Sequence, residues 1–399
     1  MSAEERALPA TTETSRWHPL HALLRATGAH RNLDIAIGRT VHTGSERPQL
    51  LISNPVRLLS RVAMRGDLGF AESYMAGEWD TNDLTALLMA IGANESGSRI
   101  RQGLFSERMR ERVRHALRSN SRHGSRRNIA YHYDLSNAFY SRWLDPSMTY
   151  SSAIFDDEPG LSLEAAQQRK YQRLLDALNA QPGDHILEIG CGWGGFAEEA
   201  ARRGCRVTGL TLSKEQLDYA RNRIREAGLE DLVTLEFRDY RDLSEQYDHI
   251  VSIEMFEAVG ERYWPLYFEK LGACLRPGGK AALQIITIDG NAYQYYRRRT
   301  DFIQRYIFPG GMLPPIERLE QLAQDAGLVI EDKHLHGHDY ARTLKQWHRA
   351  FDACRDEISA LGFDEGFRRM WKYYLSYCET GFLLGRINLL QLVLSGRTA

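Results

Sequence analysis

A glycine-rich turn, formed by Gly190, Gly192 and Gly194, follows the apolar residues Ile186–Ile189. Glycine adopts backbone conformations that are closed to other residues, and it lets a ligand approach the main chain closely. The turn therefore predicts the binding of a nucleotide-like ligand, with residues 196–203 forming the helix behind it. A Gly-x-Gly pattern by itself also occurs in NAD-binding folds and in tight turns that bind nothing.

The side chains around this turn narrow the choice of ligand. Glu188 lies two residues before the first glycine, where a carboxylate can meet a cationic amino acid group rather than a pyrophosphate. This position favours S-adenosylmethionine over NAD. The next apolar segment ends in Thr211 and Leu212, followed by Gln216, at the spacing where a ribose contact is expected. No acidic residue closes that segment, which argues against a dehydrogenase.

Strand-like and helix-like segments alternate along this part of the chain. Residues 205–210 and 247–252 read as further strands, and Phe237–Asp242 follows another. Such alternation predicts a doubly wound α/β fold, in which a parallel sheet carries helices on both faces. The carboxyl ends of its strands would bring the ligand-binding residues together.

Composition sets wide limits on the class of protein. The 399 residues include 51 basic and 52 acidic side chains, so no overall field favours nucleic acid. No run of eighteen apolar residues is present, and the charged start lacks a signal-peptide core, so a cytoplasmic enzyme is expected. The five cysteines have neither zinc-ligand spacing nor an even disulfide count, and no metal site is expected.

Charge is concentrated in one segment. Ten arginines and only two glutamates occur within residues 99–127, which predicts a basic helix followed by a linker, with a domain boundary near residue 122. This segment is either a solvated helix face or a surface attracted to anionic lipid headgroups. The organisation predicted from these features is a disordered tail (1–16), a small amino-terminal domain (17–98), the basic helix and linker (99–127) and a catalytic domain (128–399).

Six separated segments resemble the cyclopropane-fatty-acyl-phospholipid synthase family, over residues 60–396. They are residues 129–137, 144–155, 190–195, 255–260, 306–311 and 374–395. Members carry a methyl group from S-adenosylmethionine to a lipid alkene. The resemblance implies a mostly parallel, seven-stranded methyltransferase sheet, a helical lipid-binding lid at about residues 290–385, and the small amino-terminal domain.

The family's functional residues transfer position by position. The resemblance implies donor contacts from the residues already named around the glycine turn and from Tyr150, Ser151, Tyr240 and Arg241. In the family, a bound bicarbonate is thought to remove a proton from the carbocation that methylation leaves. Its ligands match Ser152, Glu257, Gln284, Ile286 and Tyr340, and Cys378 matches the family's active-site thiol. No step in this scheme needs a thiolate, so packing is the more natural role for Cys378.

Three positions depart from the family pattern. Gln284 replaces a histidine, so a hydrogen-bonding group is retained but a titratable one is lost. Ser152 replaces a cysteine, which matters little if the contact is through the backbone. Glu254 replaces a glycine and is expected one helical turn from Glu257. A second carboxylate can change which proton leaves the carbocation, so a methylene- or methyl-branched chain is the alternative to a cyclopropane ring.

The remaining expectations concern substrate and location. The resemblance implies phospholipid acyl chains as substrate and peripheral association with the inner face of the membrane, with homodimer formation left open. Residues 292–299 mix aromatics with arginines, as at a water–lipid boundary. Aromatic side chains of the lid could surround an acyl chain or stabilise the cation; they are Trp371, Tyr373, Tyr374 and Phe382. Retention of Glu257, Tyr340 and Cys378 argues against a catalytically inactive lipid-binding protein.

Overall fold

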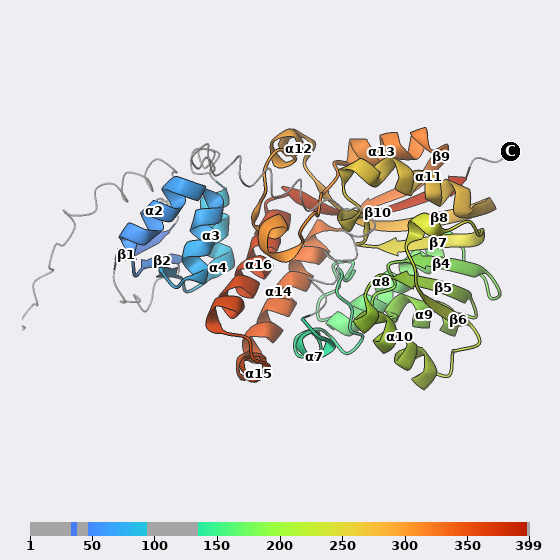
Figure 1. The fold of residues 1–399 in the computed structure, drawn as a ribbon, viewed down its shortest axis with the longest axis horizontal. Coiled ribbons are helices and arrows are strands. Elements are labelled where there is room, and N and C mark those ends of the chain that lie inside the picture. The colour runs from blue at the N-terminus through green and yellow to red at the C-terminus, as the bar shows by residue number, and fades with distance from the viewer. Residues whose placement is uncertain (1–32, 38–46, 94–134, 397–399) are drawn as a thin grey trace, which may run out of the picture. The chain divides into compact units, whose positions relative to one another are not determined.

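The computed structural model describes residues 33–37, 47–93 and 135–396. They belong to two compact units, one within residues 1–103 and the other within residues 104–399 (Figure 1). The predicted tail at 1–16, the predicted basic helix and linker at 99–127 and the boundary near residue 122 lie outside the described residues.

The amino-terminal unit combines a three-stranded sheet with helices. β1 (Asp34–Ile37) pairs in parallel with β2 (Gln49–Ile52), and β3 (Trp79–Asp80) pairs antiparallel to β2. Trp79 is fully buried and stacks on Phe70, with ring centroids 4.4 Å apart, so it forms the centre of this core. The helices of the unit are α2 (Pro55–Arg65), α3 (Asp67–Met75) and α4 (Leu84–Gly92).

The second unit is built on a seven-stranded sheet. Its strand order is β6-β5-β4-β7-β8-β10-β9, and β10 alone runs against its neighbours, so the predicted mostly parallel sheet is confirmed. The order reverses direction at β4, with β5 on one side and β7 on the other, which creates the crevice where open α/β sheets bind ligands. The strands are β4 (His185–Ile189), β5 (Arg206–Thr211), β6 (Val233–Phe237), β7 (Tyr247–Ile253), β8 (Leu275–Ile288), β9 (Leu328–Leu335) and β10 (Ile387–Gly396).

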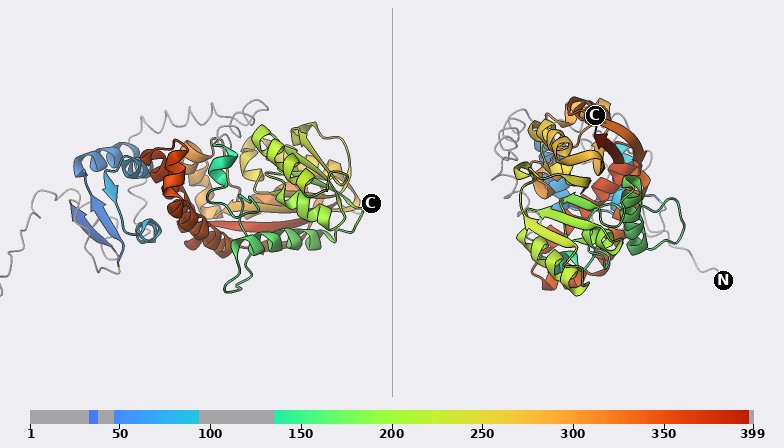
Figure 2. Two further views of the ribbon diagram at one scale, coloured as in Figure 1. Left: turned by 90° about the horizontal axis from the view of Figure 1, so that it is seen from below. Right: turned by 90° about the vertical axis from the view of Figure 1, so that its right-hand side faces the viewer.

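Helices cover both faces of this sheet, as predicted (Figures 1 and 2). Side chains alternate along each strand, so neighbouring residues enter different cores. Ile186 packs with one cluster and Leu187 with the other. The first cluster is closed by α8 (Leu163–Leu178), α9 (Gly195–Arg202) and α10 (Lys214–Glu226). The second is closed by α11 (Trp264–Cys274) and α13 (Ile316–Asp325).

A further group of helices consists of one helix that precedes β4 and four helices that follow β8. α14 and α16 pack along each other, and α14 also contacts β10 (Figure 1). The predicted lid range 290–385 contains α12, α14, α15 and α16 but not α7. It also contains β9, which is a strand of the sheet, and α13, which covers the sheet. The group comprises α7 (Asn137–Tyr140), α12 (Gly290–Tyr296), α14 (Gly337–Ala353), α15 (Arg355–Ala360) and α16 (Glu365–Leu383).

Candidate functional site

The glycine turn has the backbone geometry that its sequence predicts. After β4, Gly190, Gly192 and Gly194 have φ values of +91°, +51° and +85°, in the region that disfavours side chains. A Cβ atom on Gly190 would also lie 2.9 Å from Cγ of Met255. α9 begins at Gly195, one residue earlier than the helix predicted from sequence. The turn therefore requires glycine for both conformation and space.

A cavity opens where β4, β5 and β7 end. Ten of the eleven predicted donor-binding residues line it; the exception is Gly194, which precedes α9. Sequence reasoning missed Asp239, which also lines the cavity. Its polar side chain lies just beyond β6, and that position was the available signal. The ten residues are Tyr150, Ser151, Glu188, Gly190, Gly192, Thr211, Leu212, Gln216, Tyr240 and Arg241.

Glu188 lines this cavity with a carboxyl group that can accept a further hydrogen bond. The residue is 3% exposed, and its Oε2 has no hydrogen-bond partner in the described part of the chain. Burial raises the pKa of Glu188 to about 8, against the opposing effect of Lys170 and Arg223. A buried, unpartnered carboxyl group gains most from a cationic ligand, because the ligand both satisfies the oxygen and stabilises its charge. The site therefore fits the amino acid moiety of S-adenosylmethionine.

Replacing Glu188 with glutamine is expected to weaken binding of S-adenosylmethionine about tenfold, because a charge-assisted hydrogen bond becomes a neutral one. Isothermal titration at pH 8.5, where Glu188 is largely ionised, measures the dissociation constant. Thermal unfolding of the same variant checks that the fold is retained. Equal affinity in the two proteins would show that Glu188 makes no contact with the cationic group.

The opposite side of the cavity carries the predicted ribose contacts. Oγ1 of Thr211 donates to Oε1 of Gln216 at 3.2 Å, and the Ser213 amide donates to Oγ1 of Thr211 at 3.1 Å. Arg241 is held by two hydrogen bonds to the carboxylate of Asp239, at 2.9 and 2.6 Å. The Asp239–Arg241 pair is buried and positions the short helix η3 (Tyr240–Asp242) against the cavity.

Glu254 also lines this cavity, and its carboxylate accepts several hydrogen bonds. Its carboxylate accepts hydrogen bonds from the Ser152 amide (2.8 Å), from Nε2 of Gln284 (2.8 Å) and from Oη of Tyr340 (2.5 Å). These three residues are ones that the family resemblance assigns to bicarbonate, and here they meet on a side chain of the protein. The Ser152 contact is through the backbone, so a cysteine or a serine can provide it equally well.

The expected helical relation between Glu254 and Glu257 is wrong. Glu254 has a φ of +50°, just after β7, and Glu257 lies in a short 3-10 helix, η4 (Phe256–Ala258). A left-handed backbone at residue 254 breaks any helix there, and it is also a conformation that glycine adopts without strain. The glycine that the family has at this position is therefore compatible with the same backbone.

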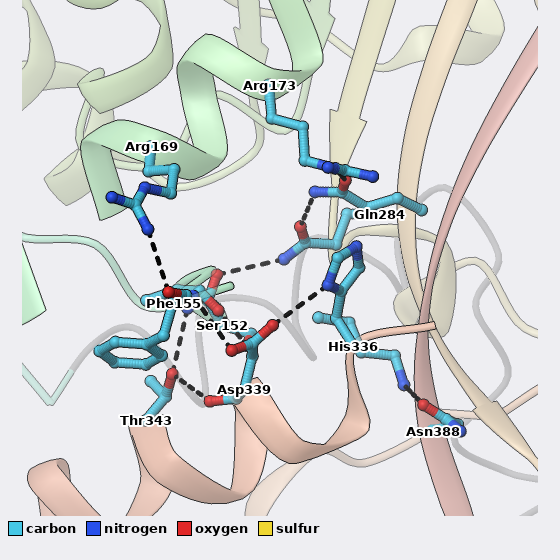
Figure 3. A network of polar contacts seen from close by, with 12 residues as sticks. Ser152, Phe155, Arg169, Arg173, Gln284, His336, Asp339, Thr343 and Asn388 are labelled. Atoms are coloured by element: carbon cyan, nitrogen blue, oxygen red, sulfur yellow. Dashed lines mark hydrogen bonds and ion pairs between the residues drawn. The ribbon is translucent and has the colours of Figure 1, made fainter. Parts of the chain in front are cut away.

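The segment that carries Ser152 is held against α14 and α8. The amides of Ala153 and Phe155 donate to Oγ1 of Thr343 (3.1 Å) and to Oδ1 of Asp339 (3.0 Å), respectively (Figure 3). On the other side, Nζ of Lys170 donates to Oγ of Ser151 at 2.6 Å. Fixing this segment on both sides aims the Ser152 amide at Glu254.

Glu257 and Ile286 form a separate pair. The Ile286 amide donates to Oε1 of Glu257, while Oε2 of Glu257 has no hydrogen-bond partner among the described residues. Burial and the nearby Glu254 carboxylate raise the pKa of Glu257 to about 8. Burial raises the pKa of Glu254 as well, but three hydrogen-bond donors and the nearby Lys170 oppose this effect, whereas Glu257 has one donor. Of the two carboxyl groups, Glu254 is therefore the one whose charged form is better stabilised, and Glu257 keeps a proton at neutral pH.

Comparison with known proteins places the chain in a family. The family model described as mycolic acid cyclopropane synthetase matches residues 120–392. The chain belongs to this family. Its members named below share the S-adenosylmethionine-dependent methyltransferase fold, and the chain is an S-adenosylmethionine-dependent lipid methyltransferase.

Two relatives in the cyclopropane synthetase family match nearly the whole chain. The tuberculostearic acid methyltransferase UfaA1 of Mycobacterium tuberculosis is 42% identical, over 92% of this chain and 89% of its own length. The cyclopropane-fatty-acyl-phospholipid synthase of Escherichia coli is 36% identical, over 88% of this chain and 89% of its own. The structure of mycolic acid cyclopropane synthase CmaA1 complexed with SAH and CTAB has a TM-score of 0.64 and 30% identity, covering 67% of this chain and 97% of that one.

The aromatic residues predicted for substrate contact in this methyltransferase have different environments. Phe382 packs on Tyr340, with ring centroids 4.4 Å apart, and Oη of Tyr374 lies 2.7 Å from Oη of Tyr150. Trp371 is 1% exposed and packs edge-on against Phe139. Tyr373 packs against Phe302. Tyr374 thus contacts a residue of the cavity, Phe382 contacts a hydrogen-bond partner of Glu254, and Trp371 belongs to the packing between α7 and α16.

Cys378 lies on α16, near Tyr340 and Tyr374. Burial raises the pKa of the Cys378 thiol well above its usual range. The thiol therefore stays protonated at neutral pH, and only a thiolate is an effective nucleophile. This favours packing as the role of Cys378 and leaves its predicted catalytic role without a chemical step.

Replacing Glu257 with glutamine is expected to make the free energy of unfolding decrease less steeply as the pH rises. A carboxyl group whose pKa is raised in the folded state binds more protons there than when unfolded, so the free energy of unfolding decreases between about pH 4.5 and pH 8. The variant lacks this contribution, which is at most about 1.4 kcal/mol per pH unit. Urea unfolding at several pH values measures it, with Glu269→Gln on the exposed side of α11 as control. An unchanged slope would show that Glu257 is ionised in the folded protein.

Proposed function

We propose that this methyltransferase transfers the methyl group of S-adenosylmethionine to the cis double bond of a phospholipid acyl chain and leaves a methylene branch, with Glu254 as proton acceptor. The observation that carries the proposal is the set of contacts on Glu254. Its carboxylate occupies the hydrogen bonds from Ser152, Gln284 and Tyr340 that the family resemblance assigns to bicarbonate. In this proposal, the Glu254 carboxylate accepts the proton that bicarbonate is thought to accept in the family.

The residues of the cavity have distinct tasks in this reaction. When bound, S-adenosylmethionine supplies the methyl group as an electrophile. Glu188 and the glycine turn hold the donor, and orientation matters because an alkene is a weak nucleophile. The alkene π electrons form the new C–C bond as the donor's C–S bond breaks, which leaves a carbocation on the acyl chain. Tyr340 donates to Glu254 and Phe382 packs on Tyr340, and these aromatic rings can stabilise the cation.

The product depends on when and where the cation loses its proton. Immediate loss from the transferred methyl closes a cyclopropane, because the C–H electron pair forms the third ring bond. A hydride shift from the methylated carbon first gives a more stable tertiary cation. Loss of a proton from the methyl then gives a methylene branch, and Glu254 takes that proton in either case. A saturated methyl branch would also require a reductant.

The three hydrogen bonds that fix Glu254 do not by themselves choose between ring and branch, because the transferred methyl loses the proton on both routes. The branched product is favoured by the relative at 42% identity, which is named a tuberculostearic acid methyltransferase and not a cyclopropane synthase.

The phospholipid substrate implies contact with a membrane surface, and we place this contact on the inner face of the membrane. Among the described residues, no helix is long and apolar enough to cross a bilayer. α12 offers an interfacial pairing instead: Tyr295 is 40% exposed, and the guanidinium of Arg299 lies 4.1 Å from the centre of its ring. Such pairs suit the boundary between headgroups and acyl chains.

The test uses S-adenosylmethionine with a deuterated methyl group and vesicles of phospholipid with cis-monounsaturated chains. Mass spectrometry counts the deuterium in the product, and NMR distinguishes a ring from an exocyclic methylene. We expect a methylene branch that retains two deuteriums, and no product from vesicles with saturated chains. A ring with two deuteriums would overturn the proposed product, three deuteriums would overturn the site of proton loss, and no lipid product would overturn the function.

A further inference from the structure

A chain of three hydrogen bonds leads from the surface of α8 to Glu254. Nε of Arg173 donates to Oε1 of Gln391 at 2.9 Å, and Nε2 of Gln391 donates to Oε1 of Gln284 at 3.0 Å. Nε2 of Gln284 then donates to Oε1 of Glu254 at 2.8 Å. Figure 3 shows the part of this relay between Arg173 and Gln284, together with Ser152.

The sheet places the two glutamines side by side. Gln284 on β8 and Gln391 on β10 are directly opposite each other in the antiparallel register, and both are buried. Gln284 follows Ala282 on the face of the sheet that α8 covers. Arg173 belongs to α8, so its guanidinium reaches Gln391 from above the same face.

The two ends of the relay impose the same direction on it, because a carboxylate only accepts hydrogen bonds and an arginine only donates them. A glutamine side chain can present either its oxygen or its NH₂ group to a neighbour, whereas an arginine has only donors. Gln391 must therefore turn its oxygen to Arg173 and its NH₂ group to Gln284. Gln284 in turn must present its oxygen to Gln391 and its NH₂ group to Glu254. With the opposite polarity, the amide oxygen of Gln284 would face the carboxylate and repel it.

We propose that Arg173 is a positioning residue, which through Gln391 and Gln284 fixes an N–H donor on the carboxylate of Glu254. The proposal rests on the proposed role of Glu254 as proton acceptor. It also explains how an amide can replace the family's histidine at position 284. Nε2 of Gln284 donates to the Ser152 carbonyl at 3.3 Å as well as to Glu254, and the relay holds the amide oxygen on the other side. Arg173 forms no ion pair with the described residues, so the hydrogen bond to Gln391 is its one polar contact there.

Other titratable groups also act on Glu254, and a substitution at residue 173 leaves them in place. Tyr340 on α14 donates to its carboxylate, and Glu257 in η4 adds a second carboxyl group. Burial lowers the pKa of Lys170 on α8 to about 7, so the charge of Lys170 near Glu254 also changes between pH 5 and pH 9. Lys170 is held by Ser151 and Gln167 rather than by the relay. A changed pH dependence in an Arg173 variant therefore reports on the relay.

The experiment compares Arg173→Met and Arg173→Lys with the wild-type protein, using methyl transfer to unsaturated phospholipid vesicles from pH 5 to pH 9. We expect Arg173→Met to lower kcat about tenfold, to move the acid limb of the pH profile up by about one unit and to leave the KM for the donor unchanged. Arg173→Lys, which still has only donors, restores the profile. Arg203→Met, which removes a half-buried arginine paired with Asp176, controls for the loss of one positive charge.

Two results would overturn the proposal. One is a wild-type pH profile in Arg173→Met. The other is an equal effect of Arg173→Met in a Gln284→Leu background, because an effect that travels through Gln284 must disappear there. If the wild-type protein methylates no lipid, the proposed function fails while the relay remains testable. Infrared titration of the Glu254 carboxyl band, assigned with Glu254→Gln, then measures the pKa of Glu254 directly. We expect this pKa to be higher in Arg173→Met, and an unchanged pKa would overturn the proposal.

Discussion

Replacing Glu254 with glutamine lowers the turnover number for lipid methylation by about 10²–10⁴-fold, the usual contribution of a positioned general base. Glutamine has nearly the same shape but cannot accept the proton that leaves the carbocation. Its oxygen can still accept from the Ser152 amide and from Gln284, and its NH₂ group can donate to Oη of Tyr340. The loss of turnover is therefore expected without loss of the fold, and steady-state kinetics with unsaturated phospholipid vesicles measures it.

The control for the Glu254 variant is its affinity for the donor. Glu188 and the glycine turn are unchanged in it, so the dissociation constant for S-adenosylmethionine is expected to stay within about twofold of the wild-type value, a difference well below 1.4 kcal/mol. A variant that binds the donor normally and methylates lipid at the wild-type rate would remove Glu254 from the chemistry. The three hydrogen bonds on its carboxylate would then be structural only.

Replacing Gly190 with alanine is expected to weaken donor binding about 10–100-fold and to destabilise the fold. Residue 190 has a φ of +91°, and an added Cβ atom would lie 2.9 Å from Cγ of Met255. Left-handed backbone costs an alanine about 1–2 kcal/mol, and the contact with Met255 forces a further shift of the turn. Isothermal titration gives the affinity, and thermal unfolding gives the change in stability.

Gly228 provides a matched control for the Gly190 substitution. Its φ is +68°, and an added Cβ atom would meet nothing within 4 Å. Gly228→Ala therefore introduces backbone strain of the same kind at the end of α10, away from the cavity. We expect this control to lose stability but to keep its affinity for the donor. Equal losses of affinity in both variants would show that destabilisation, and not the geometry of the turn, weakens binding.

The glycine turn and the sheet that carries it were predictable because their signals are local. Three glycines at alternate positions after an apolar strand specify a turn, and Glu188 lies two residues away in the same segment. The alternation of strands and helices then indicated a parallel sheet whose strand ends meet. Neither inference depends on which distant residues come into contact. The structure confirms the sheet, and the comparison with known proteins confirms the family.

The polar centre of the site depends on long-range contacts that a sequence pattern does not encode. Glu254 meets Ser152 from 102 residues earlier and Tyr340 from 86 residues later. Its partnership with these residues required the fold, and so did its left-handed backbone, which replaced the expected helical relation to Glu257. The relay from Arg173 was equally hidden, because it depends on β10 running against β8 and placing Gln391 beside Gln284.

The central claim is that Glu254 does the work of bicarbonate, and the dependence of methyl transfer on bicarbonate tests it most directly. Turnover is measured in buffer depleted of carbon dioxide, with and without added bicarbonate, for the wild-type protein and for Glu254→Gly. The φ of +50° at residue 254 suits glycine, and the substitution exposes the donors on Ser152, Gln284 and Tyr340 to a small anion. We predict that the wild-type rate is independent of bicarbonate and that Glu254→Gly is inactive until bicarbonate is added. A wild-type protein that stops in depleted buffer and recovers with bicarbonate would contradict the claim.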